Sequence, residues 1–519
     1  MSRPVGRVMI SAALSIMVIN AATKVLGFAR DQGLAVMFGA GPQSDAYMVA
    51  STIPTLLFGT VAGAVGAAFL PVFTEYLCRE RSQEAWDLAS SLLNTVLLAS
   101  AALAVLGMLL APQVVTVIAP GFDAGTSQLA SRLLFLMFPA IIATGVYSLL
   151  AAVLHSFRRF IAPALGPMVL NITVILGIYL VAPRWGIPAV AAATLVGSGL
   201  QTMIVLAMVS RTGLRYRWGI NWHHPGLARV LALSVPIVLG GLTGQAYLII
   251  DRRLASGLEA GSISALAFAN KLVQLPLGLF ALAIATVLYP AFSEYASGRD
   301  YRALGQSVQS GLRMVALITL PASVGLMVLR EPIIRLLFQR GQFDARSTQL
   351  TAVAVLCYGL GMLFHASNQV LVRGFHSMQD TVRPVLISGG TVCINLVFAV
   401  LLVRPLGHAG LALANSIGAL SGFVLLVALL RNTVPLPHGP FLRTMGRLAV
   451  SSVIMGLAAV FTHRGAQWVF RGRWGGLLEV GAAIGVGCLV YAIMLWRLGV
   501  DDLQPVLALV RNWTRPRAM

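Results

Sequence analysis

The chain contains the same sequence pattern twice, about 220 residues apart. Residues Phe122–Leu129 (FDAGTSQL) match Phe343–Leu350 (FDARSTQL) at an offset of 221. Upstream, Leu70–Tyr76 (LPVFTEY) matches Tyr289–Tyr295 (YPAFSEY) at an offset of 219. A chain duplicated in this way is expected to fold into two copies of one structure. In a hydrophobic chain such repeats are typical of transporters that bind their cargo between the copies.

The composition places this duplicated chain in a membrane. Of its 519 residues 58% are hydrophobic and only 10% are charged, and the mean hydropathy is +0.84. Soluble domains carry about 25% charged residues. The sequence therefore predicts an all-α polytopic membrane protein. We predict about fourteen spans, near residues 8–38, 46–76, 88–117, 127–154, 161–182, 187–210, 230–251, 263–292, 305–329, 349–372, 384–403, 409–430, 444–463 and 475–497.

The spacing of the repeats predicts how these spans are grouped. Six predicted spans separate each copy from its partner. Because six is even, the two copies have the same orientation and are related by an axis along the membrane normal. We expect an N-terminal lobe at residues 1–217 and a C-terminal lobe at residues 218–432, each of six helices. Two additional helices and a basic tail then occupy residues 433–519.

The net charge of +20 follows from this membrane topology and predicts no nucleic-acid partner. Polytopic membrane proteins concentrate arginine in their cytoplasmic loops. With the N-terminus inside, more of the 37 lysines and arginines fall at the inner face than at the outer face. This excess predicts that both termini are cytoplasmic, although Arg464, Arg471 and Arg473 in one outer loop oppose that assignment.

The sequence carries no signature of catalysis or of a cofactor. The four cysteines are scattered and have no metal-binding spacing. No phosphate-binding GxxxxGK[ST] loop is present, so we expect no ATPase site. We predict a protein that is not an enzyme and has no catalytic residue, metal or cofactor. Its energy then comes from a possible coupling ion, from the membrane potential or from downhill use of the substrate.

Ionisable residues inside the spans are the main candidates for a binding site. The chain has only two lysines, Lys24 and Lys271, and both lie within predicted spans. Such a group costs about 2.5–3.5 kcal/mol at mid-bilayer and needs water or a partner. Asn20, Lys24 and Asp31 share one face of the first helix, since their spacing is i, i+4 and i+11. Asp31 could pair with Lys24.

Two cations are predicted at the same depth in the two lobes. Arg30 and Lys271 both lie roughly 12–14 Å below the outer ends of their helices. They would share a cavity if the first and eighth helices faced each other. Asn270 and Gln274 accompany Lys271 on the eighth helix. Arg30 is about 120° around the helix from Lys24, and a bend between them would bring both to one cavity.

Three cations near one acid favour an anionic ligand. A pyrophosphate would neutralise Lys24, Arg30 and Lys271 better than a neutral sugar or a cationic drug. A structural interpretation remains open, in which Lys24 pairs with Asp31 and Lys271 extends to the membrane surface. Asp45, at the start of the second helix, is either a site residue or a helix cap. Prolines inside spans, at positions 54, 139, 236, 276 and 321, predict kinked helices.

Short motifs near the N-terminus resemble one transporter family. Val25–Asp31 (VLGFARD), Phe38–Gly41 (FGAG) and Ser44–Ala46 (SDA) resemble the first helix and turn of the MurJ (MviN) lipid II flippases, in the MOP exporter superfamily. Pro71–Tyr76 (PVFTEY) and Ala119–Phe122 (APGF) continue the resemblance. It covers residues 10 to about 430, and the last two helices match by number alone.

The resemblance implies a bacterial cytoplasmic-membrane protein with a cationic cavity for a lipid-linked pyrophosphate. It also implies that the two C-terminal helices form a groove for the polyprenyl tail. Arg30 and Asp45 match family residues directly, whereas Lys24 and Lys271 stand where many relatives have arginine. Lysine keeps the charge but loses the bidentate fork. Residues Thr55–Val65 depart from the family, because they carry no charge where many members have an Arg-Arg pair and a glutamate.

The leading hypothesis is a flippase for a polyprenyl-pyrophosphate glycan, with lipid II as the first candidate. Its pyrophosphate site comprises Lys24, Arg30 and Lys271, with membrane lipids as further partners. The supporting residues are Asn20, Asp31, Asp45, Asn270 and Gln274. Export of another lipid-linked polysaccharide precursor stays open because helix 2 lacks charge. A cation-coupled drug exporter of the MATE type would need acidic cavity residues, and a non-transporting scaffold would not need duplicated lobes.

Overall fold

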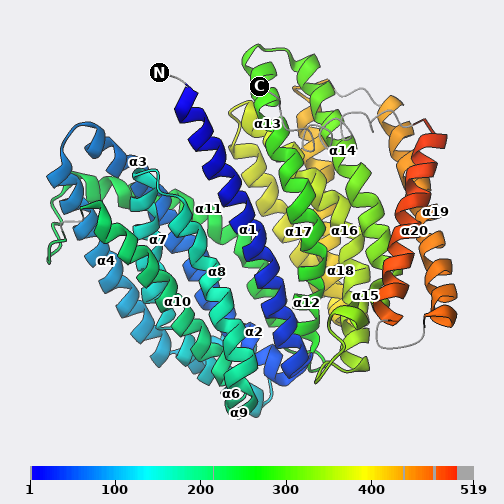
Figure 1. Cartoon of the computed structure of the whole chain (residues 1–519), viewed down its shortest axis with the longest axis horizontal. Coiled ribbons are helices and arrows are strands. Elements are labelled where there is room, and N and C mark those ends of the chain that lie inside the picture. The colour runs from blue at the N-terminus through cyan, green and yellow to red at the C-terminus, as the bar shows by residue number, and fades with distance from the viewer. Residues whose placement is uncertain (1–2, 214–215, 436–438, 471–474, 500–519) are drawn as a thin grey trace. The chain divides into compact units, whose positions relative to one another are not determined.

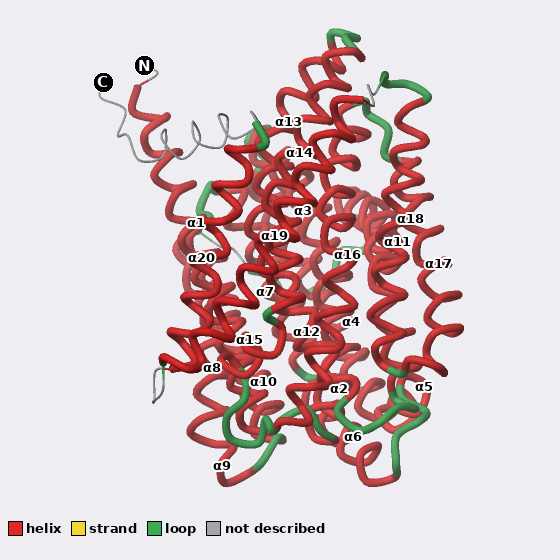
Figure 2. The backbone as a smooth tube through the Cα atoms, turned by 90° about the vertical axis from the view of Figure 1, so that its right-hand side faces the viewer, coloured by secondary structure: helices red, strands yellow, loops and turns green. Residues whose placement is uncertain are grey.

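The computed structural model describes residues 3–213, 216–435, 439–470 and 475–499, and the regular secondary structure in these ranges is helical (Figures 1 and 2). Among the described residues, twelve helical segments are long and apolar enough to cross a membrane. Helices α1 (Arg3–Phe38) and α11 (Pro225–Ala255) occupy the two remaining predicted spans. The all-α polytopic class is confirmed, and the number fourteen is compatible with the structure. Helices suit a bilayer because each satisfies its own backbone hydrogen bonds.

Contacts divide the chain into two units. The first comprises Met1–Ser264 with Gly341–Phe343, and the second comprises Ala265–Arg340 with Asp344–Met519. Helix α11 packs against α3 (Gly63–Cys78) and so belongs to the first unit. The last two helices belong to the second unit. The division into two six-helix lobes and two additional helices was inferred from the sequence repeats. It therefore stays a prediction beside these two contact-based units.

The first unit packs around an aromatic and aliphatic core. The Phe73 and Trp86 ring centroids lie 5.6 Å apart, and Trp86 stacks on Phe157 at 5.9 Å. Helix α1 packs on α8, α8 on α10, and α3 on α7. The further elements are α2 (Pro42–Leu56), η1 (Leu57–Ala62), α4 (Ser82–Leu109), α5 (Ala111–Ile118), α6 (Ala124–Met137), α7 (Ala140–Ser156), α8 (Ile161–Leu176), η2 (Gly177–Val181), α9 (Ala182–Trp185), α10 (Pro188–Val209) and η3 (Ser210–Thr212).

The second unit contains the 33-residue helix α16 and the two C-terminal helices. Helix α16 packs against α14 and α18, and α19 packs against α20 and α14 (Figure 1). The elements are α12 (Ser262–Pro276), η4 (Leu277–Ala281), α13 (Leu282–Ser297), α14 (Tyr301–Val328), α15 (Arg330–Leu337), α16 (Ala345–Ser377), α17 (Val382–Leu406), α18 (His408–Arg431), α19 (Gly439–Val469) and α20 (Gly475–Arg497).

Both repeats contain a π-helical turn shortly after a proline. The turn η1 begins three residues after Pro54, and η4 begins directly after Pro276. Proline has no N–H to donate, so the regular hydrogen-bond ladder is broken at these places and a wider turn replaces it. The Ser148 hydroxyl donates to the Ala62 carbonyl at the end of η1 at 2.7 Å. Pro236 and Pro321, in contrast, lie within helices that continue through them.

The duplicated FDA segments form the same helix cap in both repeats. The Asp123 carboxylate accepts from the Thr126 backbone N–H at 3.0 Å, and the Asp344 carboxylate accepts from the Ser347 backbone N–H at 2.8 Å. Each aspartate thus satisfies one of the unpaired N–H groups at the start of α6 or α16. The sequence repeat is therefore also a structural repeat at this place.

We expect Asp344 to make stability depend on pH in the acid range. The Ser347 backbone N–H stabilises the charged carboxylate and holds the pKa of Asp344 below its usual value. Its contribution is present above the unfolded pKa of about 3.9 and is lost as pH falls through the lower folded pKa. The thermal midpoint of Asp344→Ala should lie below wild type at neutral pH and converge with it in acid. A difference that stays constant down to the acid range contradicts this cap.

Candidate anion-binding site

Arg30 is held in a fixed position by two polar partners in the first unit. Its Nε and Nη2 donate to Asp31 Oδ1 at 2.9 and 2.7 Å, and its Nη1 donates to Asn171 Oδ1 at 3.1 Å. The Asp31 side chain is 8% exposed and the Arg30 side chain 30% exposed. The structure gives Asp31 an ion pair with Arg30, and the pairing with Lys24 that the sequence suggests stays a prediction.

Asn171 of α8 was not foreseen as a site residue. Its amide donates to the Thr23 carbonyl of α1 at 3.3 Å, while its oxygen accepts from Arg30. A Cβ on Gly27 would lie 3.6 Å from Asn171 Nδ2, so this glycine leaves room for the amide. The available signal was a single amide within the otherwise apolar span at 161–182. Asn171 therefore orients the guanidinium from a neighbouring helix.

The Arg30 guanidinium still has donors for a ligand. A guanidinium has five N–H donors, and the contacts to Asp31 and Asn171 use three of them. Two N–H donors remain, and the guanidinium that carries them is partly exposed and already oriented. Such a fork matches the oxygens of a phosphate or carboxylate. The arrangement can bind an anion without reorganising the arginine.

The other predicted residues of α1 lie on its exposed surface. Asn20 and Lys24 are both exposed and are one helical turn apart. Helix α1 is continuous from Arg3 to Phe38, so the structure assigns no break between Lys24 and Arg30. Asn20, Lys24 and Arg30 thus add polar groups along a helix that is otherwise largely apolar.

A second polar group lies on α12, in the second unit. Lys271 and Gln274 are exposed, and Gln274 Nε2 donates to Asn270 Oδ1 at 2.7 Å. Leu272 and Val273 are buried within the unit, so α12 presents its polar residues on the opposite face. In a membrane this face needs water, a polar ligand or another protein surface. Lys271 therefore stays a candidate for the same ligand chemistry as Arg30.

Asp45 does not cap its own helix, because the N-cap of α2 is Gly41 and no side chain bonds there, but it caps the start of α12. Its Oδ2 accepts from the Gly261 N–H at 2.7 Å, and its Oδ1 accepts from the Ser264 N–H and hydroxyl, each at 2.7 Å. Gly261 precedes α12 and has no side chain to cap it, so Asp45 supplies the missing oxygens. Gly261 has a φ of +95°, and a Cβ there would lie 2.3 Å from the Ala40 carbonyl oxygen. Only glycine fits this position.

Comparison with known proteins identifies the family of the chain. The model for the lipid II flippase MurJ family matches residues 34–472. The chain belongs to the MurJ family. It is 30% identical over 520 residues to the probable lipid II flippase MurJ of Vibrio cholerae, covering 96% of this chain and 97% of that protein. It is 31% identical over 507 residues to the lipid II flippase MurJ of Burkholderia cenocepacia, covering 94% and 97%.

Solved structures agree with this assignment. A lipid II flippase MurJ in an inward closed conformation matches with a TM-score of 0.81 and 26% identity, over 94% of this chain and 99% of that one. An inward-facing MATE family transporter of the MOP superfamily matches with a TM-score of 0.67 and 15% identity, over 81% and 98%, which is a likeness of fold alone. The predicted MurJ family is confirmed. The protein is a multi-pass membrane transporter rather than an enzyme.

The uncharged part of helix 2 contains an irregular turn. Residues Thr55–Val65, which carry no charge, contain the whole π-helical turn η1. A Cβ on Gly241 of α11 would lie 2.4 Å from the Thr60 methyl carbon, so α11 approaches η1 closely. At this place the chain has an irregular turn and a close helix contact but no charged side chain.

Proposed function

We propose that the protein translocates lipid II from the inner to the outer leaflet of the bacterial cytoplasmic membrane by alternating access. The observation that carries this proposal is the Arg30 guanidinium, which is oriented by Asp31 and Asn171 and keeps unused donors, in a chain of the MurJ family. The chain matches relatives that are named lipid II flippases, and the match covers nearly the full length of both proteins. An anionic pyrophosphate is the part of such a substrate that an oriented arginine recognises best.

In this proposal Lys24, Arg30 and Lys271 bind the pyrophosphate. Asn20, Asp31, Asp45, Asn270 and Gln274 support them, either by orienting a cation or by fixing a helix end. Neutralisation of the cations by the substrate favours a closed state over an open one, which is what a transport cycle requires. The polyprenyl tail remains in the hydrocarbon of the membrane, along a groove beside α19 and α20, and a coupling ion would supply the direction of transport.

We propose that both termini are cytoplasmic. The support is the excess of lysine and arginine at the face that contains the N-terminus. In that orientation the junction of α14 and α15, and the connection between α19 and α20, are at the outer face. Arg464 lies there, while Arg471 and Arg473 lie outside the described residues.

A second candidate is transport of a different polyprenyl-pyrophosphate glycan. The observation that favours it is the absence of charge in Thr55–Val65, because contacts from that part of helix 2 to a head group are then weaker than in many relatives. Pyrophosphate recognition by Lys24, Arg30 and Lys271 would be the same for both substrates.

Direct binding to the purified full-length protein distinguishes these substrates. We expect lipid II to bind at least roughly tenfold more tightly than a polyprenyl-pyrophosphate carrying an unrelated sugar, which corresponds to about 1.4 kcal/mol. The Arg30→Ala variant should weaken binding of both, since it removes a contact to their shared pyrophosphate. Equal affinity of the wild type for both lipids would favour the second candidate. Binding of neither lipid would contradict the proposal.

A further inference from the structure

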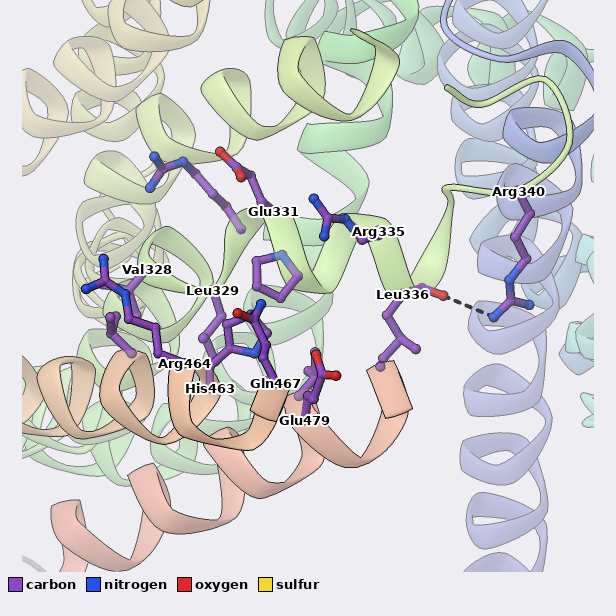
Figure 3. A pocket seen from close by; sticks show the side chains of 15 residues that line it. Val328, Leu329, Glu331, Arg335, Leu336, Arg340, His463, Arg464, Gln467 and Glu479 are labelled. Atoms are coloured by element: carbon purple, nitrogen blue, oxygen red, sulfur yellow. Dashed lines mark hydrogen bonds between the residues drawn. The ribbon is translucent and has the colours of Figure 1, made fainter. Parts of the chain in front are cut away.

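The second unit contains a cavity lined by four arginines, which the proposed pyrophosphate site does not include. We call it the arginine cavity. Its volume is about 480 Å³, within the range of about 300–1,000 Å³ that is typical of ligand pockets. It lies where the end of α14 and helix α15 meet α19 and α20 (Figure 3). Its charged lining residues are Arg330, Glu331, Arg335, Arg340, Arg464 and Glu479. Four arginines and two glutamates leave the lining with an excess of two positive charges.

Two arginines line this cavity from different helices and keep their donors. Arg335 of α15 and Arg464 of α19 have no hydrogen bond or ion pair with any residue in the part of the chain that the structure describes. Arg330 and Arg340 each donate to a backbone carbonyl, at 2.8 and 3.2 Å. A guanidinium has five N–H donors, so unused forks face this space from both sides. Such forks match the oxygens of phosphate groups.

An imidazole in the lining also lacks a partner on one of its two nitrogens. His463 Nε2 lies 3.1 Å from Gln467 Nε2, and this contact orients the ring. His463 Nδ1 is buried, and none of the described residues forms a hydrogen bond with it. Buried polar atoms are normally satisfied, so this nitrogen favours a polar ligand or water in the arginine cavity.

The arginine cavity adjoins one end of the groove that the proposed function gives to the polyprenyl tail. This apolar groove has a volume of about 390 Å³ and is lined by α14, α19 and α20. Leu329 lines both spaces. Ala459 of the groove is followed directly by Val460 of the cavity along α19. The groove and the arginine cavity are therefore neighbouring parts of one continuous surface within the second unit.

The covalent structure of the transported lipid connects these two spaces. Its polyprenyl tail is bonded directly to the pyrophosphate, so a tail in the groove places the pyrophosphate at one of the groove's ends. A pyrophosphate that joins a lipid to a sugar carries one negative charge on each phosphate. The arginine cavity has an excess of two positive charges, so the charges balance. The end of the groove beside this cavity therefore suits the pyrophosphate.

The arginine cavity lies at the level of the membrane surface. Trp468 is 77% exposed and lies one helical turn beyond Arg464 on α19. Exposed tryptophans gather at the level of the lipid head groups. With both termini cytoplasmic, as proposed above, the end of α19 and the start of α20 are at the outer face. A pyrophosphate in this cavity has therefore already crossed the membrane.

We propose that the arginine cavity is an exit site, which binds the pyrophosphate of the lipid after translocation. Arg335 and Arg464 contact the two phosphates while the tail still lies in the groove. Both arginines are exposed, so water weakens their attraction for the phosphates and the lipid can leave for the outer leaflet. The exit site is thus a second pyrophosphate site, separate from Arg30. This inference rests on the proposed function, which supplies the substrate and the place of its tail.

Lipid II binding to variants of the purified full-length protein tests the exit site. Arg30→Ala/Asp31→Asn loses the proposed transport site, so its lipid II affinity should be lower than that of the wild type but still measurable. Adding Arg335→Gln/Arg464→Gln to this variant should lower the affinity at least roughly tenfold further, since charge-assisted contacts are lost. Adding Glu479→Gln instead should raise the affinity, because it removes a negative charge beside the phosphates. A purely structural role of the cavity would not give these opposite signs.

Two controls show whether the effect belongs to the pyrophosphate and to this cavity. Arg184→Gln replaces an exposed arginine of α9 and should leave lipid II affinity unchanged. Polyprenol, which has the same tail but no phosphate, should bind equally to the wild type and to Arg335→Gln/Arg464→Gln.

Three outcomes overturn the exit site. The first is unchanged lipid II affinity after Arg335→Gln/Arg464→Gln, with a thermal midpoint that confirms folding. The second is complete loss of binding in Arg30→Ala/Asp31→Asn, because the cavity would then hold no lipid of its own. The third is binding of inorganic pyrophosphate as tight as that of lipid II, which would make the cavity an ion site. If Arg30→Ala/Asp31→Asn instead binds lipid II as tightly as the wild type, the proposed transport site fails, and the substitutions of Arg335 and Arg464 still decide the exit site.

Discussion

Replacing Arg30 by alanine abolishes growth of a bacterium that depends on this protein as its lipid II flippase, while the amount of protein in the membrane is unchanged. The variant removes the oriented guanidinium and its two unused donors. Charge-assisted hydrogen bonds are worth about 1.5–3 kcal/mol each, so we expect the transport rate to fall roughly 100-fold. Arg30→Lys should keep part of the activity, since it keeps the charge but loses the fork.

A variant that separates function from stability makes this result decisive. Arg30→Ala removes the ion pair of the buried Asp31 carboxylate with Arg30, which can itself destabilise the protein. Arg30→Ala/Asp31→Asn removes that charge and should be folded but still inactive. Asn171→Ala should reduce transport less, because it only loosens the orientation of Arg30. If Arg30→Ala, Lys24→Ala and Lys271→Ala all support normal growth, the pyrophosphate site is wrong.

The helices and the polar clusters followed from local patterns in the sequence. Apolar stretches of bilayer length predicted the spans, and the duplicated FDA segments predicted equivalent positions in two repeats. Lysine and arginine inside apolar spans are costly, so Arg30 and Lys271 were recognisable without any knowledge of their neighbours. These inferences needed only the residue types and the helical period.

The partners of these residues did not follow from the sequence. Lys24 and Asp31 share a helix face but are seven residues, or about 10 Å, apart along the axis, whereas Arg30 adjoins Asp31 and folds back onto it. Asn171 reaches Arg30 across 141 residues of chain. Such contacts depend on how α1 and α8 are rotated and shifted against each other, and a helical pattern fixes neither quantity.

Loss of the Asp45 carboxylate should lower the stability of the protein more than loss of the Ser264 hydroxyl that it contacts. Asp45 is 3% exposed, and its two oxygens accept from two backbone N–H groups and from one hydroxyl, 216 and 219 residues away. Asp45→Ala leaves both N–H groups buried without an acceptor, at about 1–3 kcal/mol each. We therefore expect a loss of about 2–6 kcal/mol, measured as a lower thermal midpoint of the purified protein.

Substitution of the hydroxyl partner separates the carboxylate's role from ordinary packing. Ser264→Ala removes one hydrogen bond to Asp45 Oδ1 but leaves the two backbone contacts, so it should cost about 1 kcal/mol. In the double variant the two effects should not add, because the hydroxyl has lost its carboxylate already. The stability of Asp45→Asn should fall between those of Asp45→Ala and Ser264→Ala. Its amide oxygen can still accept from one backbone N–H, whereas its amide nitrogen is a donor and cannot accept from the other. If Asp45→Ala costs no more than Ser264→Ala, the cap at the start of α12 contributes little, and Asp45 serves transport through some other contact.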